Sequence, residues 1–511
     1  MCLIDNSARE RPTMEFQLDR QHAKPLYIQL SEQLQERIRS GSLPAGTKLP
    51  PVRDLAESLG LTRLTVHNAY SELQASGWVE AYVGRGTFVA ERIKPIIPAY
   101  EIRQRVVDEL QTPWFSQGML ADMLRLAQQP NLISFAQAAP AEETFPVREI
   151  GRAIQQALRD PSALGYGPTQ GELCLREAIA TWLLDRNVVT SPDHVLVTTG
   201  AQQGVALALK AFVRQGDVVL VEEPTYLGFI EQATALGVRL IGIPLDDQGL
   251  RLDILQRVLC EYKPRLLYTV PTFHNPTGVC LSTERQEALL QLAQEHNLII
   301  LEDDVYGPLS YDAQAPHPIK ARDTNGQVVY LGSFSKILTP GLRLGYLVAR
   351  DEFLHPLLTA KRGNDLHCSP LLQRALADYL GRGQLAAHLR YVRELYRERR
   401  DAMERALNRY CPRDIQWTHP RGGLCYWLTL PSGLNGTDIY TEAIEAGVGV
   451  TLGNVFFPQP PRNAHLRLCF ATQSPELIDR GIRILGDVLT RHVLRCGQLA
   501  ARAWRETTPL M

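Results

Sequence analysis

Short apolar runs recur through the middle of the chain, and each is separated from the next by a helix-length amphipathic stretch. The clearest runs are residues 195–197, 218–221, 266–268, 298–301 and 328–331. Because these runs are short and almost free of polar residues, they are typical of strands buried on both faces of a parallel sheet. Their alternation with helices predicts an α/β fold.

The chain is too long for one hydrophobic core. It has 511 residues, whereas single cores stop growing beyond about 250–300 residues. Changes in composition predict a first domain at 20–90, a polar, proline-containing linker at 91–125 and a large domain at 126–493. Within the large domain we expect a long charged helix at 382–410 and, from Gly422 onward, a smaller α+β lobe.

Composition excludes several classes of protein. Hydrophobic residues make up 45% and charged residues 21% of the chain, which is ordinary for a globular protein. No run of about 18 uncharged apolar residues is present, and the first residues lack the apolar core of a signal peptide. The nine cysteines include no CxxC pair. We therefore expect a cytoplasmic protein with reduced thiols, no membrane segment and no metal site.

The amino-terminal region has the pattern of a winged helix. Apolar residues at Leu26, Leu30, Leu34 and Ile38 form one face of a helix expected at 26–40, which Gly41 would end. Two short amphipathic stretches follow, 49–56 and 61–70, with Thr62 placed to cap the second. This spacing predicts a helix-turn-helix. Two strands expected at 77–80 and 84–89, around a Gly-Arg-Gly turn, would form the wing.

The motifs LP..R.LA, LT..TV..AY..L and G.GTFV occur in this order and resemble the GntR family of bacterial regulators. The resemblance implies DNA binding, with phosphate and base contacts from helical and wing positions Arg53, Thr62, Arg63, Thr65, His67, Asn68 and Arg85. Net charge adds no argument, because residues 14–92 hold nine basic and nine acidic residues. A winged helix that contacts protein is the alternative.

A lysine motif in the large region suggests covalent chemistry. Lys336 ends the stretch Gly332-Ser333-Phe334-Ser335-Lys336, and Arg343 follows seven residues later. A lysine amine forms a Schiff base with an aldehyde, and the hydroxyl groups with the arginine are suited to hold a phosphate dianion. Taken alone, however, such a lysine is usually part of a surface loop, so the interpretation depends on other motifs.

Several upstream motifs complete the pattern of a pyridine-ring site. Asp303 and Tyr306 follow a buried strand and suit a pyridinium nitrogen and a ring phenolate, although Asp303 or Asp304 could instead cap the strand. Asn275, in His-Asn-Pro-Thr-Gly, offers an amide donor or is a turn residue. The loop 198–204 precedes a helix expected at 205–213 and would bind an anion. Tyr226 is placed to stack on a ring or is a core aromatic.

Together these motifs resemble fold-type I aminotransferases over residues 130–490. The resemblance implies bound pyridoxal 5'-phosphate with a catalytic set of Lys336 as the Schiff-base lysine, Asp303 at the ring nitrogen and Tyr226 stacked on the ring. Asn275 and Tyr306 would contact the ring hydroxyl. Phosphate contacts are implied for Ala201, Gln202, Ser333, Ser335 and Arg343, with Tyr166 reaching the neighbouring subunit of a homodimer.

Two further features bear on the small molecule that the domain would take. Arg467 matches the arginine that pairs with an amino-acid α-carboxylate in this fold. Residues 137–141, Gln-Ala-Ala-Pro-Ala, replace the Gly-Gly-Leu-Pro-like stretch of many relatives. We therefore expect an altered substrate pocket.

The combination of a GntR-like winged helix with a fold-type I domain resembles the MocR subfamily of regulators. It implies a DNA-binding transcriptional regulator that recognises a double-stranded operator and responds to an amine, an amino acid or pyridoxal phosphate acting through Lys336. The alternative is a working aminotransferase, converting amino acids to 2-oxo acids, with an accessory winged helix. The complete set of catalytic residues keeps this alternative open.

Overall fold

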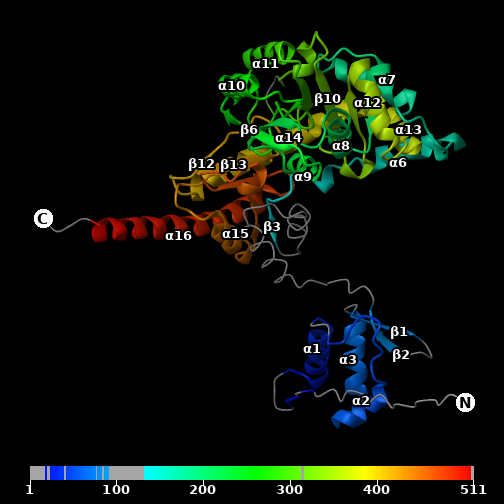
Figure 1. Cartoon of the computed structure of the whole chain (residues 1–511), viewed down its shortest axis with the longest axis vertical. Coiled ribbons are helices and arrows are strands. Elements are labelled where there is room, and N and C mark those ends of the chain that lie inside the picture. Colours follow the sequence, from blue (N-terminus) through cyan, green and yellow to red (C-terminus); the bar gives the residue numbers. More distant parts are fainter. Residues whose placement is uncertain are drawn as a thin grey trace, which may run out of the picture. The chain divides into compact units, whose positions relative to one another are not determined.

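The computed structural model describes residues 16, 18–19, 24–39, 42–75, 78–82, 86–90, 132–311 and 316–507. The chain divides into two compact units, Met1–Ile102 and Arg103–Met511. Gly41, Arg85 and the linker expected at 91–125 lie outside the described residues. Each unit is described separately below, with the element labels of Figure 1.

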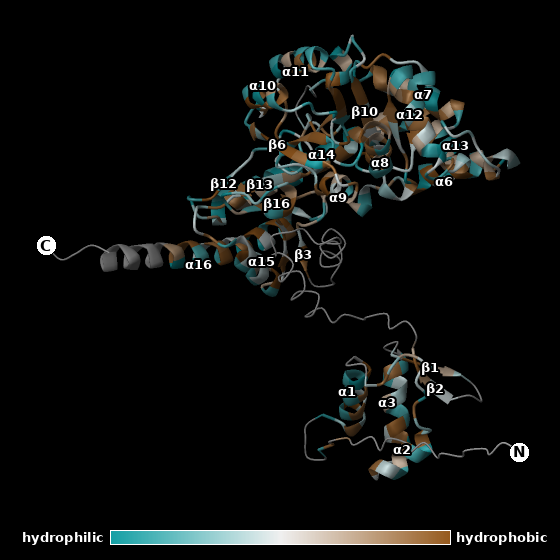
Figure 2. Ribbon diagram, in the orientation of Figure 1, coloured by the Kyte–Doolittle hydropathy of each residue, from teal (hydrophilic) through white to brown (hydrophobic). Residues whose placement is uncertain are grey.

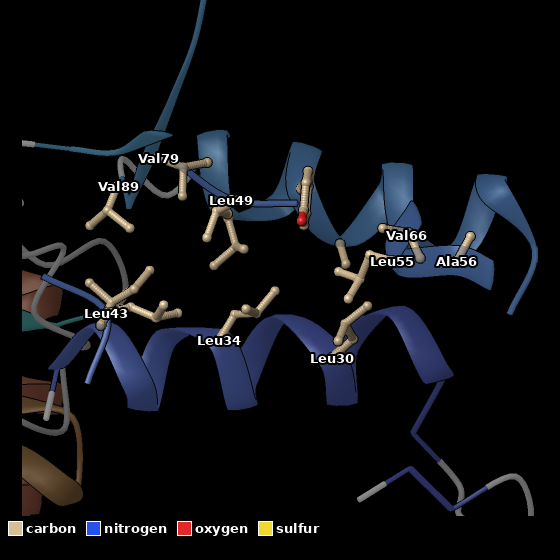
Figure 3. Packing of buried hydrophobic residues seen from close by; sticks show 13 residues of the cluster. Leu30, Leu34, Leu43, Leu49, Leu55, Ala56, Val66, Val79 and Val89 are labelled. Carbon is tan, nitrogen blue, oxygen red and sulfur yellow. The ribbon is translucent and has the colours of Figure 1, made fainter. Parts of the chain in front are cut away.

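The amino-terminal unit is a winged helix, as predicted. It comprises α1 (Leu26–Arg39), α2 (Val52–Leu59), α3 (Arg63–Ala75), β1 (Val79–Tyr82) and β2 (Gly86–Val89). The two strands pair antiparallel with Val79 opposite Val89. Leu30, Leu34 and Ile38 of the expected apolar face of α1 are buried, whereas Leu26 is half-buried. Figure 3 shows Leu30 and Leu34 pointing toward Leu55 and Val66 of the other two helices. This shared core holds the three helices together.

The turn between α2 and α3 follows from two residues. Gly60 ends α2 in the left-handed conformation, with φ of 61°, and its N–H donates to the carbonyl groups of Ala56 and Glu57. Glycine adopts this conformation without steric cost. Thr62 accepts a 3.2 Å hydrogen bond from the Thr65 N–H through its hydroxyl, which confirms the predicted cap at the start of α3.

The large unit contains an eight-stranded sheet in the order β4-β11-β10-β9-β8-β5-β6-β7. The strands are β4 (Val195–Thr198), β5 (Val218–Glu223), β6 (Arg239–Asp246), β7 (Gly249–Leu250), β8 (Leu266–Thr269), β9 (Ile299–Asp303), β10 (Val328–Ser333) and β11 (Gly345–Val348). All five predicted apolar runs are strands of this sheet. The sheet is mixed rather than wholly parallel, because β11 runs antiparallel to both β10 and β4. The connection from β10 to β11 contains no crossover α-helix, so the chain returns beside the strand it has just left.

Helices cover both faces of this sheet, and Figure 2 shows β10 in hydrophobic colours, whereas the helices carry both hydrophobic and hydrophilic residues. Leu255 of α10 and Leu289 of α11 pack in one cluster with Val328 of β10. On the opposite face Gly204 of α8 approaches β10 so closely that a Cβ there would overlap the side chain of Leu331. The helices are α6 (Val147–Ala157), α7 (Leu173–Leu184), α8 (Ala201–Phe212), α9 (Leu227–Ala235), α10 (Leu252–Glu261), α11 (Thr283–Glu295), α12 (Asp351–Arg362), α13 (Pro370–Gly381) and α14 (Gln384–Tyr410).

The predicted start of α8 was wrong by one turn. The helix begins at Ala201, not at residue 205, because Gly200 supplies the break and the Ala-Gln-Gln-Gly segment that follows is already helical. The long helix α14 begins at Gln384, close to the expected residue 382.

A smaller α+β lobe follows, as predicted. Its antiparallel sheet has the order β12-β13-β16-β15, with β12 (Gln416–Trp417), β13 (Cys425–Thr429), β15 (Thr451–Leu452) and β16 (His465–Cys469). A second pair joins β3 (Ile133–Ser134) to β14 (Val448–Gly449), and the helices are α15 (Gly436–Glu445) and α16 (Pro475–Thr507). No helix in the described part of the chain is long and apolar enough to cross a membrane.

Candidate functional site

A cavity of about 260 Å³ lies at the carboxyl ends of strands in the large sheet, next to the smaller lobe. Ligands of open α/β sheets bind at this edge because the loops that follow the strands converge there. The cavity brings together these predicted residues: Lys336, Asp303, Asn275, Tyr306, Tyr226, Ala201, Gln202, Ser333, Ser335, Arg343 and Arg467. Residues 136–138 form part of the same lining, as does the lobe residue Thr451.

Asp303 ends β9 and is almost fully buried. One carboxylate oxygen accepts a 2.8 Å hydrogen bond from the Tyr268 hydroxyl, and the other is buried without a hydrogen-bond partner among the described residues. Burial raises the pKa of Asp303 to about 7, because a low-dielectric surrounding disfavours the charged form. An N–H⁺ donor placed at the open oxygen would restore the charged carboxylate, and a protonated pyridine nitrogen is such a donor.

The adjacent Asp304 has a different environment. Its carboxylate accepts hydrogen bonds from the Arg186 guanidinium at 2.9 Å and the Tyr330 hydroxyl at 2.8 Å. All three side chains are buried, and Asp304 is not part of the cavity lining. Arg186 therefore neutralises the carboxylate of Asp304, whereas the carboxylate of Asp303 faces the cavity.

Lys336 lies just beyond the end of β10 with its side chain in the cavity. Its Nζ donates a 2.6 Å hydrogen bond to the Ala138 carbonyl oxygen. Burial, together with the positive charge of Arg467, lowers the pKa of Lys336. A lysine whose neutral form is favoured is a better nucleophile toward an aldehyde.

One end of the cavity is built to hold an anion. Ala201 and Gln202 begin α8, where backbone N–H groups have no partner within the helix. Gly200 precedes them with φ of 77°, and a Cβ there would lie 2.9 Å from Nη2 of Arg343. Nη2 also donates to the Thr199 carbonyl oxygen at 3.3 Å. With Ser333 and Ser335 these groups offer the N–H, hydroxyl and guanidinium donors that a phosphate dianion requires.

Aromatic rings form a wall of the cavity. The Tyr226 hydroxyl accepts a hydrogen bond from Gln202, and burial raises the pKa of Tyr226 to about 12. Burial likewise raises the pKa of Tyr306, so both phenols stay protonated near neutral pH. Tyr268 stacks on Phe229 with ring centroids 4.0 Å apart, which holds its hydroxyl toward Asp303.

Asn275 is held by the loop that follows β8. The imidazole of His274 contacts the Thr277 hydroxyl at 2.8 Å through Nδ1, and its Nε2 lies 3.1 Å from the buried carboxylate of Glu222 in β5. These contacts tie the loop to the sheet and leave the Asn275 side chain in the cavity.

Arg467 projects from β16 of the smaller lobe toward the same cavity. Its guanidinium donates to Asn275 Oδ1 at 3.0 Å, to the Ala136 carbonyl oxygen at 2.6 Å and to the Thr451 hydroxyl at 3.2 Å. The guanidinium carbon lies 4.8 Å from the centroid of the Phe456 ring. These hydrogen-bond acceptors are neutral, and Nε is buried without a partner among the described residues. A buried cation surrounded in this way favours a bound carboxylate.

Tyr166 is the one predicted cofactor residue outside this lining. Its side chain is 91% exposed and contacts the ring of His367 edge-on, with centroids 5.6 Å apart. Its expected contact with the neighbouring subunit's phosphate stays a prediction.

Sequence reasoning missed several contributors. Tyr268 was recognised only as part of a strand, although a phenol at the carboxyl end of a buried strand was a usable signal. Thr451, Phe456 and the carbonyl groups of Ala136 and Ala138 follow no motif and reach the cavity only through folding of the lobe. The unusual stretch 137–141 is part of the site, because the Ala138 carbonyl oxygen accepts a hydrogen bond from Lys336 Nζ.

The amino-terminal unit presents its predicted DNA contacts on α2 and α3. The side chains of Arg53, Arg63, His67 and Asn68 are exposed. Thr62 is also exposed, whereas Thr65 is half-buried, and their hydroxyl groups hydrogen bond to each other at 2.8 Å. Arg63, His67 and Asn68 lie in the first turns of α3, the part of a recognition helix that approaches base edges, whereas Arg53 lies in α2.

Comparison with known proteins matches both units. Residues 130–485 match the family aminotransferase class I and II, and residues 26–89 match bacterial regulatory proteins, gntR family. YdfD of Bacillus subtilis, named as an uncharacterized HTH-type transcriptional regulator, is 31% identical over 90% of this chain and 96% of its own. MocR of Rhizobium meliloti, a probable rhizopine catabolism regulatory protein, is 30% identical over 92% of this chain and 94% of its own.

A solved structure resembles the large unit alone. LysN, the α-aminoadipate aminotransferase of Thermus thermophilus, was crystallised with N-(5'-phosphopyridoxyl)-L-leucine. It is 36% identical, with a TM-score of 0.69 over 76% of this chain and 97% of that one. The two regulators, by contrast, span both units.

The fold and the site define a DNA-binding winged helix joined to an aminotransferase fold that binds pyridoxal phosphate. The chain belongs to the aminotransferase class I and II family, and its gntR-type helix-turn-helix makes it a transcriptional regulator of the MocR type.

Proposed function

We propose that this regulator senses an amine or amino acid, or pyridoxal phosphate itself, in the cavity around Lys336, and that binding there changes its affinity for a double-stranded operator. The observation that carries the proposal is the arrangement of the cavity. A lysine amine with a lowered pKa and a buried arginine whose hydrogen-bond acceptors Asn275, Ala136 and Thr451 are neutral meet in one cavity.

The residues of the cavity fit pyridoxal phosphate. This cofactor, when bound, supplies an aldehyde that condenses with amines and a ring that accepts electrons. We assign Asp303 to the ring nitrogen, Asn275 and Tyr306 to the ring hydroxyl and Tyr226 to the ring face. The anion end, formed by Ala201, Gln202, Ser333, Ser335 and Arg343, would hold the phosphate. The open oxygen of Asp303 supports this orientation, because it is a buried acceptor without a donor on a residue that lines the cavity.

An amino-acid effector would act on two of the chain's own residues. Its amine would take the place of the Lys336 amine at the cofactor, and Lys336 Nζ would then be free to donate to the Ala138 carbonyl oxygen, as it does in this structure. Its carboxylate draws Arg467 away from Asn275, Ala136 or Thr451. Because the contact with Asn275 joins the smaller lobe to the loop after β8, the effector would shift the balance between two arrangements of the domain.

The proposal extends to assembly and location. We propose a homodimer in which Tyr166, exposed in the single chain, reaches the partner's phosphate. Arg53, Thr62, Arg63, Thr65, His67 and Asn68 would contact the operator, together with Arg85 from the wing. We propose domains at 20–90 and 126–493 with a linker at 91–125, in a cytoplasmic protein because its target is DNA.

The experiment combines absorption with DNA binding. Purified full-length protein with pyridoxal phosphate should show a visible band that depends on Lys336, and one amine or amino acid from a panel should shift both this band and the affinity for operator DNA. Lys336→Ala should lose the band and the response, whereas Lys210→Ala, at an exposed lysine that bonds to Asn364, should keep both. A protein that binds DNA equally with and without every ligand tested, despite a normal band, would overturn the sensor.

A working aminotransferase is the second candidate, and the complete set around Lys336 favours it. The lowered pKa of Lys336 makes its neutral form more accessible, and a neutral lysine amine also serves to move an α-proton. Repeated turnover of an amino donor with a 2-oxo acid would support this activity, whereas a single half-reaction without turnover would favour a sensor.

A further inference from the structure

Two buried cysteines lie directly opposite each other on neighbouring strands of the lobe. Cys425 begins β13, Cys469 ends β16, and the antiparallel register pairs them. The Phe470 N–H donates to the Leu424 carbonyl oxygen. The Cys469 N–H donates to the Phe135 carbonyl oxygen and therefore not to Cys425. The cysteines are therefore a non-hydrogen-bonded pair, in which Cα atoms lie about 4.5 Å apart. This distance falls within the range of about 4.4–6.8 Å that a disulfide spans.

The two sulfur atoms are already in contact. Their Sγ atoms are 3.3 Å apart, and both residues are free thiols. Among the cysteines in the described part of the chain, no other two sulfur atoms are recorded in contact. Cys411 is half-buried and has no such neighbour recorded, while Cys174 and Cys260 are exposed.

The pair adjoins the Arg467 end of the cavity. Side chains alternate along a strand, so Arg467, two residues before Cys469 and opposite Trp427, shares the face that carries both thiols. Burial raises the pKa of Cys469, but the hydrogen bond with Cys425 and the positive charges of Arg467 and Lys336 outweigh it and lower that pKa overall. Cys469 is therefore the more easily ionised thiol of the pair, and thiolates react with oxidants.

We propose that Cys425 and Cys469 are a modification site, which a small hydroperoxide converts to a reversible disulfide, and that this disulfide strengthens carboxylate binding at Arg467. The second part rests on the proposed function of the cavity. It follows because a thiolate beside Arg467 competes with a bound carboxylate for the same cation, and a disulfide carries no charge.

The chemistry balances with hydrogen peroxide as the oxidant. The Cys469 thiolate attacks one peroxide oxygen, the O–O bond breaks, and a sulfenic acid forms as hydroxide leaves and takes up a proton to give water. The Cys425 sulfur then attacks the sulfenic sulfur, the S–O bond breaks, and a second water leaves. Two thiols lose two protons and two electrons, and the peroxide is reduced to two waters. A small dithiol reverses the change by thiol–disulfide exchange.

The first test is peptide mapping of the full-length protein. Reduced protein treated with hydrogen peroxide should yield a peptide that links Cys425 to Cys469, with a mass lower by about 2 Da than the two thiol peptides together. Oxidised glutathione should not produce the link, because both thiols are buried and this oxidant is bulky. Dithiothreitol should restore both thiols.

Matched variants separate the pair from the other cysteines. Cys411→Ser should leave the link unchanged, whereas Cys425→Ser should abolish it and leave a sulfenic acid on Cys469 that dimedone traps. If both cysteines stay alkylatable after unfolding while the exposed Cys174 is already oxidised, the disulfide is overturned. That result needs no variant, so misfolding of a substituted protein does not affect it.

The second test asks whether Arg467 responds. L-Alanine and ethylamine, which differ by the carboxylate, are titrated against the visible band of reduced and oxidised protein. Oxidation should lower the dissociation constant of L-alanine by about threefold or more, a modest electrostatic effect, and leave that of ethylamine unchanged.

An equal change for both ligands, or none for L-alanine, would overturn the link to Arg467. A disulfide that forms in a protein whose band and DNA affinity respond to no amine would instead remove the proposed sensor while leaving the modification site in place.

Discussion

Replacing Asp303 with asparagine should make the protein without cofactor more stable, although it removes a residue that we assign to cofactor binding. The buried carboxyl has a pKa of about 7 in place of its ordinary 3.8. A carboxyl whose pKa is raised by folding destabilises the folded state. This cost is absent below the unfolded pKa, grows as the pH rises through the interval between the two values, and is complete above the folded pKa.

The magnitude follows from the size of the shift. Each pKa unit corresponds to about 1.4 kcal/mol, so a shift of about three units costs about 4 kcal/mol at pH 8. At pH 5 most folded molecules keep the proton and the cost falls to about 2 kcal/mol. An asparagine side chain has the same shape as aspartate, and its amide oxygen can still accept the hydrogen bond from Tyr268. The stability advantage of Asp303→Asn should therefore grow by about 2 kcal/mol between pH 5 and pH 8.

The assay is urea unfolding of the full-length protein, stripped of pyridoxal phosphate, at the two pH values. The test uses only the change, between pH 5 and pH 8, in the difference in unfolding free energy between the variant and the unmodified protein. Any effect of the amide that does not depend on pH, such as its own unpaired N–H group, cancels in that change. Adding pyridoxal phosphate should reverse the order, because a protonated ring nitrogen compensates the carboxylate of the parent but not the neutral amide.

Asp304→Asn is the matched control. It leaves the buried Arg186 without a charged partner and should destabilise the protein by about 3 kcal/mol at both pH values. Two results would refute the argument that Asp303 is held in the folded protein at an electrostatic cost. The unmodified protein could prove as stable as Asp303→Asn at pH 8, or the difference in unfolding free energy between the two proteins could stay the same at both pH values.

Three other substitutions test separate parts of the structure. Leu34→Ala empties a fully buried site in the winged-helix core and should cost about 3 kcal/mol, measured as a lower midpoint for thermal unfolding of that unit. Arg63→Ala should weaken operator binding in a fluorescence anisotropy titration and lower the slope of log affinity against log salt by about one if the side chain contacts a phosphate; an unchanged slope and affinity would remove it from the interface. Gly200→Ala forces a positive φ on alanine and places its Cβ 2.9 Å from Arg343. It should raise the dissociation constant of pyridoxal phosphate about tenfold in an absorbance titration, and normal binding would show that the anion end tolerates a side chain.

Much of the winged helix was predictable because its determinants are local. The leucines of α1 fall on one helical face, Gly60 and Thr62 end and begin helices through their own backbone and side-chain preferences, and the paired strands are close neighbours in the sequence. The candidate site was partly predictable for the same reason. Lys336 and Asp303 each follow an apolar strand, and the carboxyl ends of neighbouring parallel strands meet at one edge of a sheet.

Other features depend on contacts between residues far apart in the chain. Strand order decides the antiparallel direction of β11 and the hydrogen bond from Tyr268 to Asp303. The docking of the lobe decides the hydrogen bonds from Arg467 to Ala136 and Thr451. No local preference encodes them.

The sequence by itself therefore determined the two kinds of domain and the chemistry of the cofactor residues, because helical periodicity, glycine conformations and strand-end motifs act over a few residues. Only the tertiary structure decided that the Tyr268 hydroxyl donates to Asp303 and that Cys425 lies against Cys469. Burial and cross-strand register create these properties, and both arise only when segments separated by many residues pack together.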